Sequence, residues 1–254
     1  MDIVVDSLLE GARRATGVVC VIDVFRAFTT AAVALANGAS RIVMTASIEE
    51  ALALRARGTV DLCMGEARGR MADGFDFGNS PFAVSRADLR GKAIAQRTSA
   101  GTQGIVAARH ATRLYATALV TAGATARACL AASARVGVAH GAGMGVAHGA
   151  GMGVAHGAST VSLVAMGKDG LARTDEDELC ALHIRNLLEG RPGNRDAVRQ
   201  AILAGGDAGR FSPADPPHTF PEDLEIALDI DRYDFAVAVA IEDGRPVARM
   251  ERVG

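Results

Sequence analysis

The chain has 254 residues, of which 49% are hydrophobic and 22% are charged, a balance typical of a soluble globular protein. Its formal net charge of -2 gives no support to a nucleic-acid or membrane-surface partner, and no apolar run reaches the length needed to cross a bilayer. The four cysteines show no CxxC spacing, so we interpret them as free thiols of a protein in the reducing cytoplasm.

Short apolar runs with the character of strands alternate with helical segments along the chain. The expected strands are residues 3–5, 18–22, 41–45, 60–64, 93–96, 114–120, 161–166, 235–241 and 247–251. The expected helices are residues 7–15, 31–36, 51–57, 105–110, 124–134, 175–188, 194–203 and 222–228. This alternation predicts an α/β fold in a single domain over residues 1–254, with three α/β/α layers around a mostly parallel sheet. Asp243 and Gly244 form a hairpin signal, which predicts an antiparallel C-terminal hairpin at one edge of the sheet.

The stretch from Val18 to Thr30 carries the first cluster of reactive side chains. A β-branched run ends on Asp23, and Arg26, Thr29 and Thr30 follow before the helix. The carboxyl end of a buried parallel strand is where open α/β sheets place their ligands. There an arginine can bind a phosphate through two hydrogen bonds, and a carboxylate can hold a cation. An alternative remains open, in which Asp23 only caps the helix and Arg26 is solvated.

Further polar side chains follow other predicted strands. Glu66 and residues 98–102, 121–123 and 167–177 each come after a strand. In a right-handed doubly wound sheet these positions fall along one rim, so we expect them to share a ligand crevice with Asp23. The segment RTSAGTQG, which begins at Arg97, offers a guanidinium, hydroxyls and glycines at a helix start. This composition suits the binding of a phosphate or a carboxylate.

Carboxylates are more numerous near this crevice than helix caps require. They are Asp23, Glu66, Asp76, Glu176 and Asp177. Hard oxygen ligands of this kind suit Mg²⁺, which binds one or two carboxylates together with substrate phosphate. For Glu176 and Asp177 the alternative is a role as first-turn acids that interact with the helix dipole. The loop GFDFGNSP, residues 74–81, is open to two interpretations, as a turn that leads into a helix or as a plug over the site.

Several other catalytic schemes lack their motifs. The sequence contains no GxSxG, HExxH or CxxC, and no GxGxxG follows the first strand. An apolar run that ends in an aspartate is also typical of aspartyl-phosphate phosphatases. Their second aspartate, two positions further on, is Phe25 in this chain. Hydrolase triads, zincin-type sites and dinucleotide binding are therefore disfavoured.

Residues 137–158 repeat the unit GVAHGAGM twice and begin it a third time. The unit is too short and too rich in glycine to bury much surface, so we expect a loop. A metal site on His140, His148 and His156 is the weaker alternative, because no carboxylate or cysteine accompanies them. We expect that deletion of one unit leaves folding and activity largely intact.

Six motifs occur in order along the chain: VIDVFRAFTT, GEARG, GFDFGNSP, RTSAGT, EDELCA and DLEIALDID. Together they resemble the 2-phosphosulfolactate phosphatase family. The resemblance implies an α/β/α fold, Mg²⁺ as cofactor, and hydrolysis of 2-phospho-3-sulfolactate to 3-sulfolactate and phosphate, a step of coenzyme M synthesis. The sequence departs from the family pattern at Ala100, Ala124 and Leu182. These departures concern the identity of the substrate more than the fold.

The residues and the resemblance together assign roles to particular side chains. The predicted catalytic residues are Asp23, Glu66 and Arg26, and the predicted metal ligands are Asp23, Glu66, Asp76, Glu176 and Asp177. Substrate binding falls on Arg26, Thr29, Thr30, Asn79, Arg97, Thr98, Gly101 and Thr102. The expected partner is a small anionic phospho-acid, with no nucleic acid and no membrane, and a homodimer is left open. The alternatives are a phosphatase for another small phospho-acid and a non-catalytic anion-binding protein of the same fold.

Overall fold

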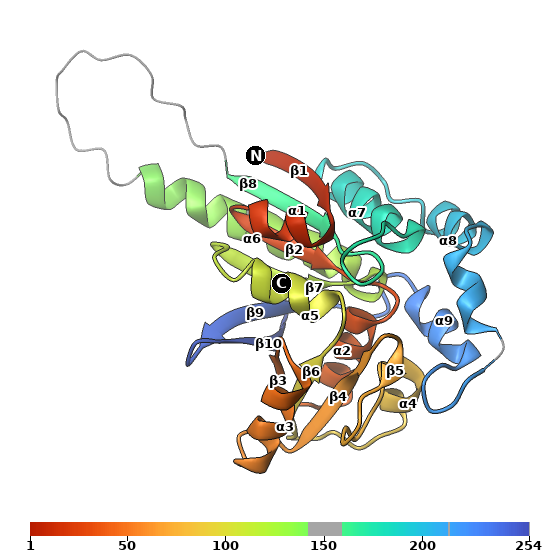
Figure 1. The fold of residues 1–254 in the computed structure, drawn as a ribbon. Helices are drawn as coiled ribbons and strands as arrows, with labels where there is room; N and C mark the ends of the chain where they lie inside the picture. Colours follow the sequence, from red (N-terminus) through yellow and green to blue (C-terminus); the bar gives the residue numbers. More distant parts are fainter. Residues whose placement is uncertain (142–158, 213, 254) are drawn as a thin grey trace.

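A computed structural model describes residues 1–141, 159–212 and 214–253 of the chain (Figure 1). In this part of the chain, ten strands form one sheet, and helices cover both of its faces. The strands are β1 (Asp2–Ser7), β2 (Val18–Ile22), β3 (Arg41–Met44), β4 (Leu62–Ala67), β5 (Arg70–Met71), β6 (Ala93–Arg97), β7 (Arg113–Thr117), β8 (Thr160–Ala165), β9 (Ala236–Glu242) and β10 (Arg245–Glu251).

The helices lie between these strands in the order that the sequence predicts. They are α1 (Leu8–Arg14), α2 (Ala27–Ala36), α3 (Ile48–Ala56), α4 (Pro81–Ser85), α5 (Gly101–Ala107), α6 (Ala122–Gly141), α7 (Asp175–Leu188), α8 (Arg195–Ala204) and α9 (Pro221–Ala227), with 3₁₀ turns η1 (Leu119–Thr121) and η2 (Asp207–Phe211). None of the helices within the described ranges is long and apolar enough to span a bilayer. The predicted three-layer α/β/α arrangement with a mostly parallel sheet is confirmed.

The buried strand β2 shows how the layers are held together. Val19 and Val21 pack into one apolar cluster with residues of α2 and α5, whereas Cys20 and Ile22 pack into another with residues of α6 and α7. All five residues of β2 are buried, because alternate side chains enter the two opposite helical layers. The β-branched run in the sequence therefore corresponds to a strand that is covered on both faces.

The C-terminal hairpin lies in the middle of the sheet, and its expected position at one edge is wrong. The strand order is β1-β8-β2-β7-β9-β10-β3-β6-β4-β5. Strand β9 pairs antiparallel with β7, and β10 pairs antiparallel with β3. The hairpin thus covers the edges of two parallel groups, β1-β8-β2-β7 and β3-β6-β4, which would otherwise be exposed.

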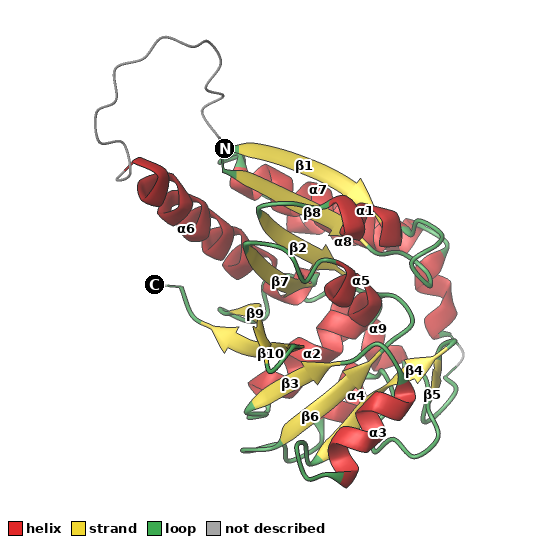
Figure 2. Cartoon of the chain, turned by 60° about the vertical axis from the view of Figure 1, so that its left-hand side comes forward, coloured by secondary structure: helices red, strands yellow, loops and turns green. Residues whose placement is uncertain are grey.

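The two parallel groups run in formally opposite directions, because three antiparallel pairings separate them. The sheet is therefore not a single doubly wound sheet, although that arrangement was the reason for expecting the site residues along one rim. Strands rotate by roughly 20–25° from one to the next, which accumulates to roughly 100–125° between β2 and β6. In Figure 2 the arrowheads of β2 and β8 point toward the same side of the molecule as those of β3 and β6. Twist thus brings the carboxyl ends of both groups to one side.

Two element boundaries differ from the sequence prediction in an informative way. Helix α5 begins at Gly101, earlier than the expected start at residue 105, and α6 continues to Gly141. Residues 137–141 of the repeat segment are therefore helical and not part of a loop. The remaining residues of the predicted repeat loop, 142–158, with His148 and His156, lie outside the described residues.

Candidate active site

A cleft of about 530 Å³ lies where the carboxyl ends of the two parallel groups meet. Its walls come from the segments that follow β2, β4, β6 and β8, and from η2. Residues of the lining include Asp23, Phe25, Arg26, Glu66, Arg68, Gly69, Asn79, Ser99, Ala100, Gly167, Lys168, Asp169, Thr174, Glu176, Arg210, Phe211 and Thr219. Five of the candidate site residues are thus brought together: Asp23, Arg26, Glu66, Asn79 and Glu176.

Asp23 is the buried carboxylate at the end of β2. Its Oδ1 accepts a hydrogen bond of 3.0 Å from the backbone N–H of Ala27, which fixes it at the start of α2. Its Oδ2 lies against Gly101, where a Cβ atom would come within 2.8 Å of that oxygen. Burial, together with the nearby charge of Glu66, raises the pKa of Asp23 to about 6. Asp23 is therefore desolvated by its burial and also lines the cleft.

Glu66 holds the loop that follows β6. Its Oε1 accepts from the backbone N–H of Ser99 at 2.6 Å, and its Oε2 accepts from Gly69 N–H at 2.6 Å and from the Ser99 hydroxyl at 3.1 Å. The Glu66 carboxylate lines the cleft and accepts these hydrogen bonds at the same time. Both oxygens of Glu66 therefore accept hydrogen bonds from the loops that follow β4 and β6. Glu66 is therefore both a negative charge in the cleft and an anchor for Ser99.

Glu176 and Asp177 are neighbours in the first turn of α7, but they have different surroundings. Glu176 lines the cleft, and its Oε2 is buried without a hydrogen-bond partner. Burial raises the pKa of Glu176 to about 7. Asp177 points to the backbone instead, where its two oxygens accept from Val24 N–H at 2.7 Å and from Gly167 N–H at 2.8 Å. Asp177 thus ties together the segments that leave β2 and β8, and it is not part of the cleft lining.

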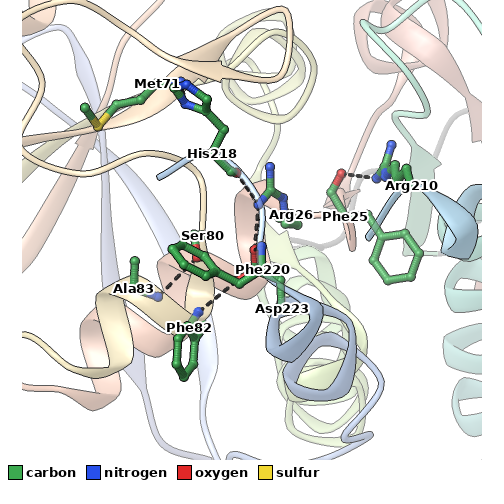
Figure 3. A network of polar contacts seen from close by, with 10 residues as sticks. All are labelled: Phe25, Arg26, Met71, Ser80, Phe82, Ala83, Arg210, His218, Phe220 and Asp223. Carbon is green, nitrogen blue, oxygen red and sulfur yellow. Dashed lines mark hydrogen bonds and ion pairs between the residues drawn. The ribbon is translucent and has the colours of Figure 1, made fainter. Parts of the chain in front are cut away.

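Arg26 enters the cleft wall as one half of a buried ion pair (Figure 3). Its Nη1 donates to Asp223 Oδ2 and to the carbonyl oxygen of His218, both at 2.7 Å. The Asp223 side chain is fully buried and also accepts from the Ser80 hydroxyl at 2.6 Å. Burial lowers the pKa of Arg26, whereas the negative charge of Asp223 opposes that shift. The segment around α9 therefore fixes both Arg26 and the loop that contains Ser80.

Several candidate site residues lie outside the cleft lining. Thr29 donates to the carbonyl oxygen of Val24 at 2.8 Å, and the buried Thr30 hydroxyl has no partner. Arg97 donates through Nη1 to the carbonyl oxygen of Glu66 at 2.8 Å, so its charge is directed at the backbone. Asp76 forms an ion pair with Arg55 at 2.6 Å, remote from the cleft lining.

Thr98 and Thr102 form a local cap at the start of α5. The N–H of Thr98 donates to the Thr102 hydroxyl at 2.8 Å, and the N–H of Thr102 donates to the Thr98 hydroxyl at 3.1 Å. These reciprocal bonds satisfy N–H groups at the helix start. Ser99 and Ala100, between Thr98 and Gly101, are the residues that reach the cleft.

The segment after α8 also contributes to the cleft, although none of its residues was predicted from the sequence. Arg210 and Phe211 lie on the cleft wall, as do Arg68 and Lys168 from two other loops. Arg210 donates to the carbonyl oxygen of Phe25 at 2.6 Å and lies 3.5 Å from Glu176 Oε1. The segment is a short 3₁₀ turn between α8 and the DLEIALDID motif, and no residue pattern in it signals that it reaches the cleft. Arg68 lies within the GEARG motif, so that motif alone could have identified it as a candidate site residue.

Unsatisfied polar atoms in the cleft lining indicate what the cleft can bind. Asn79 Oδ1, Thr174 Oγ1 and Glu176 Oε2 are all buried without a partner. A buried oxygen that accepts no hydrogen bond lowers the stability of the fold unless a ligand or a cation contacts it. Among the described residues no group of three or more histidine, cysteine or carboxylate side chains is arranged to hold a metal on its own. Asp23 and Glu176 both line the cleft, and carboxylate oxygens are the ligands that Mg²⁺ prefers, with waters and substrate oxygens commonly completing its shell.

A comparison with family models matches residues 4–206 to the model described as 2-phosphosulpholactate phosphatase. A "Probable 2-phosphosulfolactate phosphatase" of Synechococcus sp. (strain CC9605) is 41% identical over 109 residues, which cover 42% of this chain and 45% of the relative. The protein of the same description from Bacillus subtilis (strain 168) is 29% identical over 170 residues, 67% of this chain and 63% of the relative. A third, from Thermotoga petrophila, is 45% identical over 85 residues, 34% of this chain and 37% of the relative. The matched region thus spans about half the length of the relatives, or less, except in Bacillus subtilis.

Proposed function

The chain belongs to the 2-phosphosulpholactate phosphatase family, and on that premise we propose that it hydrolyses the phosphomonoester of (R)-2-phospho-3-sulfolactate with the help of Mg²⁺. The products are 3-sulfolactate and phosphate, and the reaction is of the type used in coenzyme M synthesis. The observation that carries the proposal is the pair of buried carboxylates, Asp23 and Glu176, which share a polar cleft with guanidinium groups and with unsatisfied oxygens.

Mg²⁺ is the cofactor that this donor set suits. Asp23 and Glu176 would hold it, because burial without a full set of donors penalises their charged forms and a cation relieves that penalty. When bound, the ion would neutralise charge on the phosphoryl oxygens and polarise the ester. Glu66 contributes further negative charge close to Asp23, although its oxygens already accept hydrogen bonds from the protein.

The remaining groups of the cleft bind and orient the substrate. Arg26 lines the cleft, is held by its ion pair with Asp223, and would bind the phosphate there. Asn79 and Thr174 offer polar atoms to the substrate or to a bound water. As a ligand of the ion, Asp23 would also orient the attacking water at the cleft wall. We also propose a cytoplasmic location, supported by four buried free thiols.

The test is phosphate release from (R)-2-phospho-3-sulfolactate by the purified chain, with Mg²⁺ and with a chelator. We expect turnover that requires the metal, and we expect Asp23→Asn to lower the rate at least about a hundredfold. Asp196→Asn, on an exposed face of α8, is the matched control, because it removes the same charge far from the cleft. 2-Phospholactate and phosphoglycolate complete the panel. Turnover of one of these alone would establish a phosphatase for another phospho-acid, and tight binding without turnover would establish an anion-binding protein.

A further inference from the structure

The cleft lining holds two further guanidinium groups, those of Arg68 and Arg210, and the environment of Arg210 differs from that of Arg26. The Arg26 charge is balanced by Asp223, and only 8% of its side chain is exposed. Arg210 retains 36% of its side-chain exposure, and its nearest acid is Glu176 at 3.5 Å. Within the described residues its guanidinium donates one close hydrogen bond, from Nη2 to the carbonyl oxygen of Phe25. The other donors of the Arg210 fork are therefore available to a ligand.

Two aromatic rings hold this guanidinium in place. The Arg210 Cζ atom lies 5.3 Å from the centre of the Phe25 ring and 5.4 Å from that of Phe211, and these rings meet edge to face at 4.9 Å. Arg26 lies over the same Phe211 ring at 5.7 Å. Cation–π contact and stacking orient a guanidinium without using its donors. Figure 3 shows Arg210 next to Phe25, apart from the network in which Asp223 binds Arg26.

The arrangement suits a substrate with more than one acid group. A phosphomonoester that also carries carboxylate and sulfonate groups needs cationic donors for each, and the proposed Mg²⁺ and Arg26 serve only the phosphoryl end. We propose that Arg210, oriented by Phe25 and Phe211, forms a second anion subsite that binds one of the non-phosphate acid groups of the substrate and thereby selects phosphomonoesters that carry a further acid group. This inference rests on the proposed function and adds a specificity-determining residue to it. Arg210 lies beyond residue 206, where the match to the family model ends.

The test separates affinity for the acid group from affinity for phosphate. The dissociation constants of 3-sulfolactate and of inorganic phosphate are measured by calorimetry with Mg²⁺ at pH 8, for the wild type and Arg210→Gln. We expect 3-sulfolactate to bind about 10- to 100-fold more weakly to the variant, as for the loss of a charge-assisted hydrogen bond. We expect phosphate to bind within about twofold of the wild type. Arg210→Lys keeps the charge but loses the fork, so an intermediate affinity is expected.

Arg191→Gln is the matched control, because it removes an exposed arginine that pairs with Glu189 outside the cleft. Thermal unfolding of each variant verifies that the fold is retained. Titrations with lactate and with 2-hydroxyethanesulfonate assign the subsite to the carboxylate or to the sulfonate. Unchanged 3-sulfolactate affinity in Arg210→Gln, an equal loss for phosphate, or no 3-sulfolactate binding by the wild type would each overturn the subsite. Failure of the wild type to release phosphate from the substrate counts against the proposed function instead.

Discussion

The buried ion pair between Arg26 and Asp223 makes a quantitative prediction. Asp223→Ala removes the acceptor for Arg26 Nη1, for the Ser80 hydroxyl, and for the backbone N–H groups of Phe82 and Phe220 at 3.0 and 3.1 Å. It also leaves the Arg26 charge buried without a partner. Removal of one member of a buried pair lowers the free energy of unfolding by about 3–5 kcal/mol. For a chain of this size that corresponds to a fall in Tm of about 10 °C.

The assay is urea unfolding at pH 7.5, followed by circular dichroism, for Asp223→Ala, Arg26→Met and the double variant. Because the double variant no longer buries an unpaired charge, we expect it to be more stable than Asp223→Ala alone, with a coupling free energy of about 0.5–3 kcal/mol. The exposed pair Arg90–Asp88 is a suitable control, and Asp88→Ala should leave the urea midpoint of unfolding within the error of the assay. A loss below about 1 kcal/mol in Asp223→Ala, or strict additivity in the double variant, would refute the reasoning.

Three further predictions concern the cleft and its supports. An acid whose pKa is higher in the folded than in the unfolded state binds more protons in the native state. The contribution of Glu176 to the free energy of unfolding therefore falls as the pH rises from 4.5 to about 7. Glu176→Gln should remove this pH dependence of the free energy of unfolding and stabilise the metal-free chain at pH 8 by up to about 3 kcal/mol. It should also lower phosphatase activity. Parallel profiles of stability against pH for the variant and the wild type would contradict the prediction. Gly101→Ala should lower activity and stability together, because its Cβ would come within 2.8 Å of both Asp23 Oδ2 and the buried Ala27 Cβ, whereas Gly104→Ala should lower mainly stability, because its Cβ would come within 2.4 Å of the Met166 sulfur; assays of kcat and Tm on both variants check the contrast. Asp177→Asn loses one of two backbone acceptor contacts and should lower the free energy of unfolding by about 1–3 kcal/mol in chemical denaturation, and an unchanged value would show that the two loops are held by other contacts.

The sequence predicts the local elements well, because their signals are local. The run that ends at Asp23 and the first-turn acids of α7 are found where the periodicity places them. The different roles of Glu176 and Asp177 could not be predicted, because neighbours in a helix face different directions and only the packing decides which one meets the cleft. The partner of Arg26 lies 197 residues away, and no spacing indicates it. A hairpin signal likewise specifies two adjacent strands but not the edges against which they pair.

The position of the hairpin has a consequence for how the chain reaches its native state. Strands β9 and β10 follow all the other strands in sequence, yet they join the two parallel groups of the sheet. The pairing of β10 with β3 closes a loop of about two hundred residues, between Val43 and Val247. Such long-range contacts are entropically expensive and slow folding. Until they form, β7 and β3 present bare edges to other molecules, so a truncation before β9 should yield a chain that aggregates rather than a smaller folded protein.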